Sequence, residues 1–323
     1  MSAICPDLTV SLINHSNPAL LQACLRSLYA ATHTLTMDVW VVDNATDGRG
    51  VAAMQAEFPD VQWIFNTQRQ GFSANHNQVL RQATGRYACI LNDDTIIHEG
   101  AFDKLVDYMD ANPQVGMVGA KLLNTDGSIQ NCTFHFMTLL SELIGICALP
   151  GPLCSLKAWG IDKAQYSKEP ARVDWVLGAC IIVRAATLQQ VGLLDSVLSP
   201  IANTEEVDWC QRAWRAGWQV AYYPQAVITH YGGQSLQTSG RGPDNIRVEM
   251  MRTRIAYFRK HHGLLISIAL RLIYTVTLPW NLLMLTQSRI RKHLDRDRYR
   301  SDVSTIFQIA QMSLRTTALS EEF

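Results

Sequence analysis

The chain of 323 residues lacks paired cysteines of the kind that form a metal or redox motif. Its eight cysteines are scattered and include no Cys-x-x-Cys pair, which argues against a zinc site or a thiol–disulfide centre. Several lie inside apolar runs, as small buried hydrophobic residues do, and we expect them to stay reduced in a cytoplasmic setting. The first residues show no basic segment followed by an apolar stretch, so we expect no signal peptide.

An excess of charge of one sign is also lacking. Lys and Arg number 28 and Asp and Glu number 28, so nothing attracts the chain as a whole to nucleic acid, and we expect no such partner. Residues 247–300 nevertheless carry 12 Lys and Arg against 3 Asp and Glu, while the rest carries 16 against 25. A basic and apolar tail on an acidic body indicates an anionic membrane surface as a partner.

Glycine-rich phosphate loops are scarce. The segment Gly48–Ala53 fits a dinucleotide fingerprint with Ala in its last place, but it follows the second expected strand instead of the first. Residues 43–47 also intervene where that motif needs a tight turn. We therefore do not expect a dinucleotide site here.

Two adjacent acids end a short apolar run. Residues Tyr87–Leu91 read as a buried strand, and Asn92, Asp93 and Asp94 follow at its carboxyl end, where open α/β sheets bind ligands. Adjacent carboxylates repel unless a cation offsets them, and Mg²⁺ or Mn²⁺ bound to a diphosphate would do so. A solvated turn is the alternative, because these residue types also favour turns.

Strand and helix patterns alternate through the first hundred residues. This alternation predicts an α/β fold with a doubly wound, mostly parallel sheet. Later segments predict further strands over Val115–Leu123 and Val173–Val183, and two short ones over Val220–Tyr223 and Ala226–Ile228. The expected strands of the first part are Leu8–Ile13, Met37–Val42, Val61–Phe65 and the one that ends at Asp93.

A second acidic cluster lies far along the chain. Glu205, Glu206 and Asp208 follow Thr204, a good helix N-cap, and acids in a first turn complement the helix dipole. That structural role explains one or two acids more easily than three. His230 follows an expected strand and precedes Tyr231 and two glycines, a suitable place for a ligand.

These motifs, in this order, resemble the family 2 glycosyltransferases of the GT-A fold, and most of all their bacterial rhamnosyltransferase-like branch. The resemblance covers about residues 8–235. It implies a nucleotide-binding half and an acceptor half, followed by C-terminal helices. The motifs that carry it are Val41–Asn44, Gly71–Asn77, Leu91–Thr95, Asp174–Ala179, Glu205–Arg212 and His230–Gly233.

The resemblance implies a donor that is a UDP-sugar or a dTDP-sugar. Asp43 would accept a hydrogen bond from the imide N–H of uracil or thymine. The other residues expected to line the nucleotide are Asn14, Ser16, Asn75, Asn77 and Asp93.

The resemblance also implies the metal site and the base. Asp94 is the last acid of the Asp-x-Asp motif, whose first Asp is Asn92 here, and it would bind Mn²⁺ or Mg²⁺ together with His230. Glu206 stands where the family has the Asp of a Glu-Asp pair and would be the catalytic base, with Glu205 or Asp208 as alternatives. The expected acceptor-binding residues are Asp174, Trp175, Gly178 and Ala179, although Trp175 also fits a buried structural role.

The expected activity is inverting, metal-dependent transfer of a sugar, such as rhamnose, to a saccharide or polyprenyl-linked acceptor during synthesis of cell-surface polysaccharide. A sugar nucleotidyltransferase and a non-catalytic scaffold of the same fold are the alternatives. The first is disfavoured because no glycine- and arginine-rich phosphate loop lies near the first strand.

The expected domains are residues 1–240, the catalytic domain, and 241–323, a basic and apolar helical region. We expect a cytoplasmic enzyme peripheral to the inner face of the cell membrane. The run Leu264–Leu285 is interrupted by Arg271 and Pro279, which favours a helix pair lying in the membrane interface. A membrane span and packing on the catalytic domain stay open.

Overall fold

A computed structural model describes residues 5–14, 17–46, 48, 51–147, 160–198, 204–232, 243–291 and 295–314. The chain forms two compact units. Unit 1 comprises Met1–Phe136, Ile161–Ser196 and Glu205–Ser239. Unit 2 comprises Met137–Gly160, Val197–Thr204 and Gly240–Phe323, so two segments that precede residue 240 belong to it.

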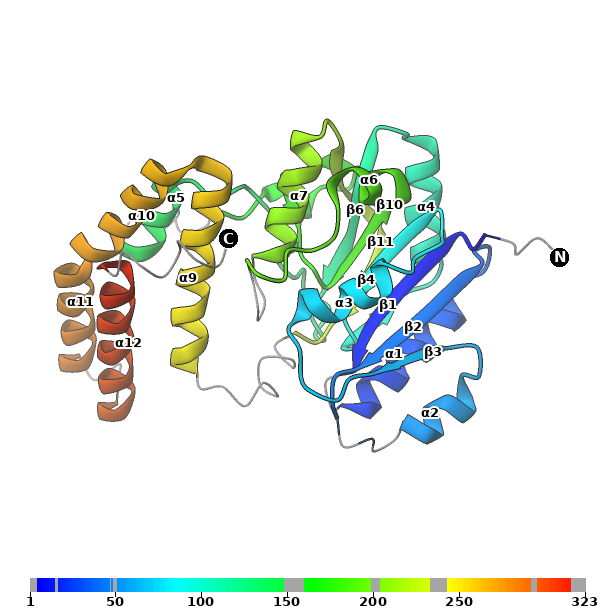
Figure 1. Cartoon of the computed structure of the whole chain (residues 1–323), viewed down its shortest axis with the longest axis horizontal. Helices are drawn as coiled ribbons and strands as arrows, with labels where there is room; N and C mark the ends of the chain where they lie inside the picture. Colours follow the sequence, from blue (N-terminus) through cyan, green and yellow to red (C-terminus); the bar gives the residue numbers. More distant parts are fainter. Residues whose placement is uncertain are drawn as a thin grey trace. The chain divides into compact units, whose positions relative to one another are not determined.

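Unit 1 is built on one large sheet with helices on both faces (Figure 1). Six strands run in one direction, and β5, β8 and β10 run against them, which confirms the expected mostly parallel α/β sheet. The spatial order is β3 (Gln62–Phe65), β2 (Met37–Asp43), β1 (Leu8–Asn14), β4 (Tyr87–Leu91), β10 (Cys180–Arg184), β6 (Val115–Leu123), β11 (Gln219–His230) and β5 (Thr95–Ile97), with β8 (Ala171–Arg172) paired to β11.

The helices of unit 1 follow from capping and apolar spacing. In α1 (Pro18–Ala31) the Asn17 side chain accepts a hydrogen bond from the backbone N–H of Leu20, and Pro18 occupies the first helical position, as the sequence predicts. Its apolar face is buried in the core. The other helices are α2 (Val51–Glu57), α3 (Phe72–Leu80), α4 (Ala101–Ala111), α6 (Ala185–Val191) and α7 (Glu205–Arg215), with a 3₁₀ turn η2 (Lys163–Tyr166).

Two expected strand boundaries are wrong. The expected strand over 173–183 is two strands, β9 (Trp175–Val176) and β10, because β9 pairs with β7 (Thr133–Phe134) and β10 pairs with β4. Residues 177–179 between them form an irregular link. The two short strands expected near 220–228 are the single strand β11, in which Pro224 cannot donate to a ladder and the register shifts between Tyr223 and Val227.

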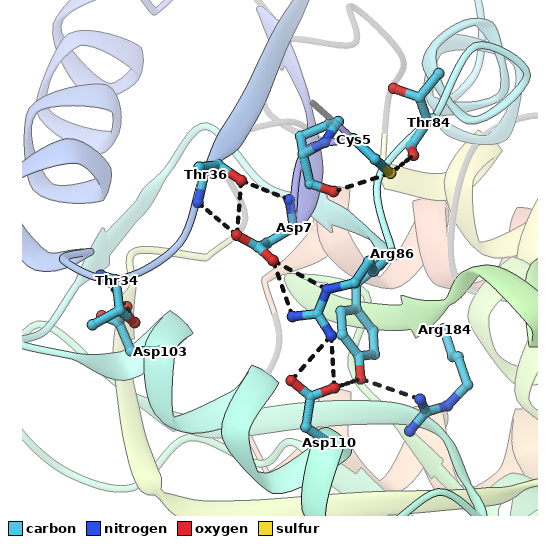
Figure 2. A network of polar contacts seen from close by, with 11 residues as sticks. Cys5, Asp7, Thr34, Thr36, Thr84, Arg86, Asp103, Asp110 and Arg184 are labelled. Atoms are coloured by element: carbon cyan, nitrogen blue, oxygen red, sulfur yellow. Dashed lines mark hydrogen bonds and ion pairs between the residues drawn. The ribbon is translucent and has the colours of Figure 1, made fainter. Parts of the chain in front are cut away.

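A polar network fixes the amino ends of β1 and β4 (Figure 2). Arg86 Nη2 lies 3.0 Å from Asp7 Oδ1, and Arg86 Nη1 lies 2.8 Å from Asp110 Oδ1. The Tyr87 hydroxyl donates to Asp110 and accepts from Arg184 Nη1. Because strands β1 and β4 run away from this network, it lies at the end of the sheet opposite to their carboxyl termini, where the predicted site residues lie.

Unit 2 is helical. It contains α5 (Leu139–Cys147), α9 (Pro243–His262), α10 (Leu264–Val276), α11 (Leu278–Ile290) and α12 (Arg296–Leu314). Glu142 of α5 lies 3.0 Å from Arg254 of α9 and accepts a hydrogen bond from the Tyr274 hydroxyl of α10, so one nearly buried carboxylate joins three helices. Removing either partner would leave a buried charge unpaired. The expected apolar run is thus two helices, and Pro279 lies in the first turn of α11.

Candidate active site

Polar side chains gather at one edge of the large sheet of unit 1. The register pairs Asn14 with Asp43 across β1 and β2, and it pairs Leu91 with Cys180 across β4 and β10. The carboxyl ends of β1, β2 and β4 therefore meet the amino end of the antiparallel β10. This edge is the place where ligands bind in open α/β sheets.

Asp43 ends β2 in a nearly closed environment. Its side chain is buried, and Oδ1 accepts hydrogen bonds of 2.7 Å from both Asn14 Nδ2 and Thr46 Oγ1. Oδ2 accepts one longer bond of 3.3 Å from the Thr46 backbone N–H. The carboxylate is thus held in one orientation, with Oδ2 the less saturated oxygen. The predicted neighbour Ser16 lies outside the described residues.

The predicted amides of α3 bind the protein itself. Asn75 Nδ2 donates to the carbonyl oxygens of Gln70 and Gly71, and its Oδ1 accepts a 2.6 Å hydrogen bond from Asn66. Asn77 exchanges two hydrogen bonds with the backbone of Leu194, at 2.7 and 3.1 Å. Both side chains therefore shape the loops around the edge, and direct contact with a nucleotide stays a prediction.

Asp94 and His230 come together from distant parts of the chain. Asp94 Oδ1 lies 3.3 Å from His230 Nε2, and both side chains are more than nine-tenths buried. The segments that carry them are joined, because β5, which directly follows Asp94, pairs with β11, and the Tyr231 backbone N–H donates to the Asp94 carbonyl. Asp93, next to Asp94, is also buried.

A chain of hydrogen bonds fixes which nitrogen of His230 carries the proton. Asp126, a carboxylate, accepts the 2.6 Å bond from the Ser128 hydroxyl, so the Ser128 oxygen accepts from Asn124 Nδ2. Asn124 Oδ1 then accepts from Gln130 Nε2, and Gln130 Oε1 lies 2.6 Å from His230 Nδ1. Because Oε1 only accepts, Nδ1 is the protonated nitrogen. We call these four residues with His230 the relay.

In a neutral His230 the relay leaves the lone pair on Nε2, whereas an imidazolium would pair with Asp94 through this nitrogen. Asn92 Nδ2 lies 3.2 Å from Nε2 and can donate to it in the neutral form, while Asp94 Oδ1 has no hydrogen-bond donor among the described residues. In that form two electron-rich atoms face each other at 3.3 Å. A divalent cation with bonds of about 2.1 Å at right angles would separate two of its ligands by about 3 Å.

The donor set fits such a cation in part. Within the described ranges no group of three or more His, Cys, Asp and Glu is arranged to hold a metal. Asp94 and His230 would therefore supply two ligands, and the remaining positions would be left for phosphate oxygens and water, as is usual for Mg²⁺ and Mn²⁺ beside a diphosphate.

Glu206 is a buried acid in the first turn of α7. It is 5 % exposed, and burial together with the charge of Glu205 raises the pKa of Glu206 to about 8, although a hydrogen bond from the Gly178 backbone lowers it. Its Oε2 has no hydrogen-bond partner among the described residues. A buried carboxyl with one unused oxygen is suited to exchange a proton with a bound hydroxyl group.

The other two acids of α7 differ in environment. Asp208 is fully buried and lies 2.8 Å from Arg212 Nε, and Arg212 also donates to the carbonyl oxygens of Val191 and Leu193. This ion pair joins Asp208 to Arg212 one turn later and, through Arg212, to the segment that follows α6. Glu205 is buried beside Glu206 and raises its pKa.

The link between β9 and β10 connects the two acidic clusters. The Asn92 backbone N–H donates to the Ala179 carbonyl at 2.9 Å, two residues before Asp94. Gly178 adjoins Ala179, and a Cβ added to Gly178 would lie 3.7 Å from Glu206 Oε1. The link therefore contacts Asn92 at one of its residues and approaches Glu206 at the next, and a shared site for Asp94 and Glu206 stays a prediction.

An aromatic pair lies on the small sheet formed by β7 and β9. The rings of Trp175 and Phe134 stack with centroids 4.3 Å apart, and Trp175 Nε1 donates to the His135 carbonyl. Asp174 Oδ2 accepts from the Phe136 backbone N–H, so it orders the strand that bears Phe134. Both rings are partly exposed, and Phe134 is an addition to the residues found from the sequence.

The sequence did not reveal Gln130. Its position follows from a turn over 124–127, after which the chain returns along β6 and forms a bridge between Leu123 and Ile129. That return brings Gln130 to His230. The turn was a usable signal for the return of the chain, but no motif marks a glutamine as the partner of a histidine.

Comparisons with known proteins agree with this geometry. The chain is 27 % identical over 271 residues to the N-acetylglucosaminyl-diphospho-decaprenol L-rhamnosyltransferase of Mycobacterium tuberculosis, covering 79 % of this chain and 85 % of the relative. A mannosyltransferase of Pyrobaculum calidifontis, solved with GDP-Man and Mn²⁺, superposes with a TM-score of 0.55 at 17 % identity, over 97 % of this chain and 88 % of that one. TarS of S. aureus, solved with UDP-GlcNAc, gives 0.54 at 12 % identity, over 94 % and 81 %.

These comparisons identify the fold and the family of the chain. The solved structures share the GT-A arrangement of a central, mostly parallel sheet with flanking helices. The model of the family described as "Glycosyltransferase like family 2" matches residues 6–242, which include the sheet edge and both acidic clusters. The chain therefore belongs to the family 2 glycosyltransferases, as the motifs of its sequence indicated.

Proposed function

We propose that this glycosyltransferase is an inverting enzyme that uses a divalent cation and a UDP-sugar or dTDP-sugar. The observation that carries the proposal is the pair of facing lone-pair atoms on Asp94 and His230. Mn²⁺ or Mg²⁺ bound there would offset the negative charge that develops on the departing diphosphate. Asp94 and His230 would hold the ion, and Gln130 would orient His230.

The nucleotide base would bind at Asp43. The fixed carboxylate presents Oδ2 as an acceptor for the imide N–H that uracil and thymine share. Asn14 and Thr46 keep this carboxylate in place, and Asn75 and Asn77 bond the backbone of Gln70 and Leu194. Guanine also has a ring N–H, so a nucleotide screen has to test this preference directly.

Glu206 would act as the base in a single displacement. The acceptor hydroxyl oxygen forms a bond to the anomeric carbon while the bond from that carbon to the diphosphate oxygen breaks. The hydroxyl proton passes to Glu206, and the nucleoside diphosphate leaves with the bonding pair. One displacement inverts the anomeric centre. The unused Oε2 of Glu206 is the atom proposed to accept the proton.

The proposed acceptor and the proposed sugar are inferred from the mycobacterial relative. The mycobacterial protein is named for transfer of L-rhamnose to N-acetylglucosaminyl-diphospho-decaprenol. We propose a polyprenyl-linked saccharide acceptor for this chain, with rhamnose the first sugar to test, as in the synthesis of a cell-surface polysaccharide. Trp175 and Phe134 would contact the acceptor saccharide, beside Asp174, Gly178 and Ala179.

A lipid-linked acceptor requires access to a membrane. In the described part of the chain one helical stretch, Leu264–Ile290, is long and apolar enough to cross a bilayer, with a mean hydropathy of 1.5. Leu265 and Val276 are 80 % and 74 % exposed on it. Arg259 and Lys260 precede the stretch. We propose that α10 and α11 lie in the interface of the cytoplasmic leaflet.

A donor screen tests the proposed reaction. The full chain is incubated with UDP-, dTDP- and GDP-sugars and a short-chain polyprenyl-diphospho-N-acetylglucosamine, and products are identified by mass spectrometry. We expect a glycosylated acceptor of inverted configuration, lost in EDTA and restored by Mn²⁺. Release of pyrophosphate would instead indicate a nucleotidyltransferase. Failure to bind any nucleotide with Mn²⁺ would indicate a non-catalytic scaffold.

A further inference from the structure

An exposed aromatic ring stands beside Asp43 at the carboxyl edge of the large sheet. The register pairs Asn14 with Asp43 and Asp43 with Phe65, which are the last residues of β1, β2 and β3. The side chains of Asn14 and Asp43 are hydrogen-bonded, and residues paired in register share a face of the sheet, so Phe65 lies on the same face. Asn14 and Asp43 are buried, whereas Phe65 is 56 % exposed. A large apolar side chain is thus open to solvent next to the carboxylate proposed to bind the base.

Two neighbours hold the ring of Phe65 in place. Trp63 lies two residues earlier on the same face, and the two rings are nearly parallel, with centroids 6.0 Å apart and 12° between their planes. On the other side, the Asn66 backbone N–H donates to the Asp43 carbonyl at 2.9 Å, and the Asn66 side chain donates to Asn75 Oδ1 at 2.6 Å. Since Trp63 precedes Phe65 along β3, the open side of the Phe65 ring is turned toward the carboxyl edge.

We propose that Phe65 is a binding residue for the donor, and that the uracil or thymine base stacks on the open side of its ring. A planar base offers two kinds of surface. Its edge carries the imide N–H that Asp43 would accept, and its face can lie against an aromatic side chain. A rigid ring next to an oriented carboxylate complements both surfaces at once. This inference rests on the proposed binding of a pyrimidine nucleotide at Asp43.

The two contacts differ in what they select. The hydrogen bond to Asp43 depends on the N–H of the edge and distinguishes one base from another, whereas stacking needs only a flat π-system and mainly adds affinity. Stacking of one base on an aromatic side chain changes Kd by about five- to 150-fold, which corresponds to about 1–3 kcal/mol. Single exposed apolar side chains also occur on surfaces that bind nothing, and a ring of that kind would leave Kd unchanged.

The probe 5,6-dihydro-UDP separates stacking from hydrogen bonding. Its base keeps the imide N–H but has lost the double bond that makes uracil flat and conjugated. The Kd values of UDP and 5,6-dihydro-UDP are measured by calorimetry on the full chain with Mn²⁺. We expect the wild type to bind UDP about fivefold or more tightly than the dihydro analogue, and Phe65→Leu to bind the two within about twofold of each other. Equal binding of both nucleotides by the wild type would overturn the proposal.

Variants of Phe65 locate the contact. Phe65→Leu should weaken UDP binding about fivefold or more, and Phe65→Trp should keep it close to the wild type because indole also stacks. The matched control is Tyr29→Leu, since Tyr29 is 37 % exposed and lies parallel to Phe58 at 5.9 Å and 14°. Because α1 leads from the carboxyl end of β1 to the amino end of β2, Tyr29 in its last turn lies toward the opposite end of the sheet. Tyr29→Leu should leave UDP binding unchanged.

Two results would refute stacking at Phe65. One is unchanged UDP binding in a Phe65→Leu variant whose melting temperature shows that it is folded. The other is an equal loss for UDP and 5,6-dihydro-UDP in Phe65→Leu, which would indicate a structural effect on the strand end. The uracil H6 resonance gives a direct readout, because the ring current of a stacked Phe65 should shift it upfield in the wild-type complex relative to Phe65→Leu.

The same measurements separate this inference from the proposed function. If UDP binding is lost in Asp43→Asn but unchanged in Phe65→Leu, the proposed nucleotide site stands and the stacking contact fails. If the wild type binds neither UDP nor dTDP in the presence of Mn²⁺, the proposed function fails, and the stacking contact fails with it.

Discussion

If His230 binds Mn²⁺ as proposed, the relay would make its affinity for the metal depend on residues of a surface turn. Replacing Gln130 by leucine keeps the size of the side chain and removes both the acceptor for His230 Nδ1 and the donor to Asn124. The protonated nitrogen of His230 would then have no fixed partner, and its tautomer and ring orientation would no longer be set. Loss of such an outer partner typically reduces metal affinity 10- to 100-fold, or about 1.4–2.7 kcal/mol.

A graded series measures the length of the relay. Asp126→Asn changes only an exposed side chain. The new amide can donate a hydrogen bond to Ser128, so the donor and acceptor roles along the relay could then be reversed. We expect the loss of Mn²⁺ affinity to increase along the series, from the smallest loss in Asp126→Asn through Ser128→Ala and Gln130→Leu to the largest loss in His230→Ala. The smallest loss would be about fivefold or less, because one hydrogen bond contributes about 1 kcal/mol.

The assay does not depend on turnover. Free Mn²⁺ is titrated by electron paramagnetic resonance in the presence of saturating UDP, and nitrogen NMR reports whether His230 carries its proton on Nδ1. The reasoning would be refuted if Gln130→Leu bound Mn²⁺ within twofold of the wild type while His230→Ala lost it. It would also be refuted by a proton on Nε2 in the wild type without metal.

Further predictions concern the base, the glycines and the nucleotide. Since the raised pKa of Glu206 favours its neutral form when folded, the wild type should lose stability as pH rises from about 4.5 to about 8, and Glu206→Gln should abolish that loss in denaturant titrations. In the wild type kcat/KM should increase as the pH rises through about 8, because only the deprotonated Glu206 can accept a proton. A kcat/KM that does not change with pH would contradict the role of Glu206. Gly178→Ala should fold normally, because the added Cβ would lie 3.7 Å from Glu206, an ordinary contact distance. Gly119→Ala should lower the melting temperature, because its Cβ would lie only 2.8 Å from Val176. Equal melting temperatures of the two variants would contradict this expectation. Asp43→Asn should weaken UDP binding at least tenfold by calorimetry with GDP binding unchanged, and an equal loss for both nucleotides would exclude selective recognition of the base.

Much of the nucleotide-binding half could be predicted because its signals are local. The sequence shows one apolar strand that leads into Asp43 and another that leads into Asp93 and Asp94. A right-handed, doubly wound connection then brings the strand ends to one edge. Pro18 and Asn17 likewise fix the start of α1 by capping alone. These features depend on residues a few positions apart.

The remainder depends on contacts between distant residues. The break at 177–179 arises because Trp175 and Val176 pair with a strand some forty residues earlier, which no apolar pattern indicates. Asn77, expected beside a nucleotide, binds Leu194. Glu206 and Asp208 both occupy the first turn of α7, so the sequence alone does not distinguish them. Their environments differ because Asp208 is paired with Arg212, whereas Glu206 is buried beside Gly178.

Strand β10 joins two parts of the large sheet. It is hydrogen-bonded to β4 on one side and to β6 on the other, so it joins the half with Asp43 and Asp94 to the half with β11. In the chain, the residues proposed to contact the acceptor, Phe134 and Asp174–Ala179, precede β10, whereas Glu206 and His230 follow it. A chimaera that exchanges everything after Arg184 would therefore replace the proposed base and one proposed metal ligand, and it would leave the proposed nucleotide-binding and acceptor-binding residues in place.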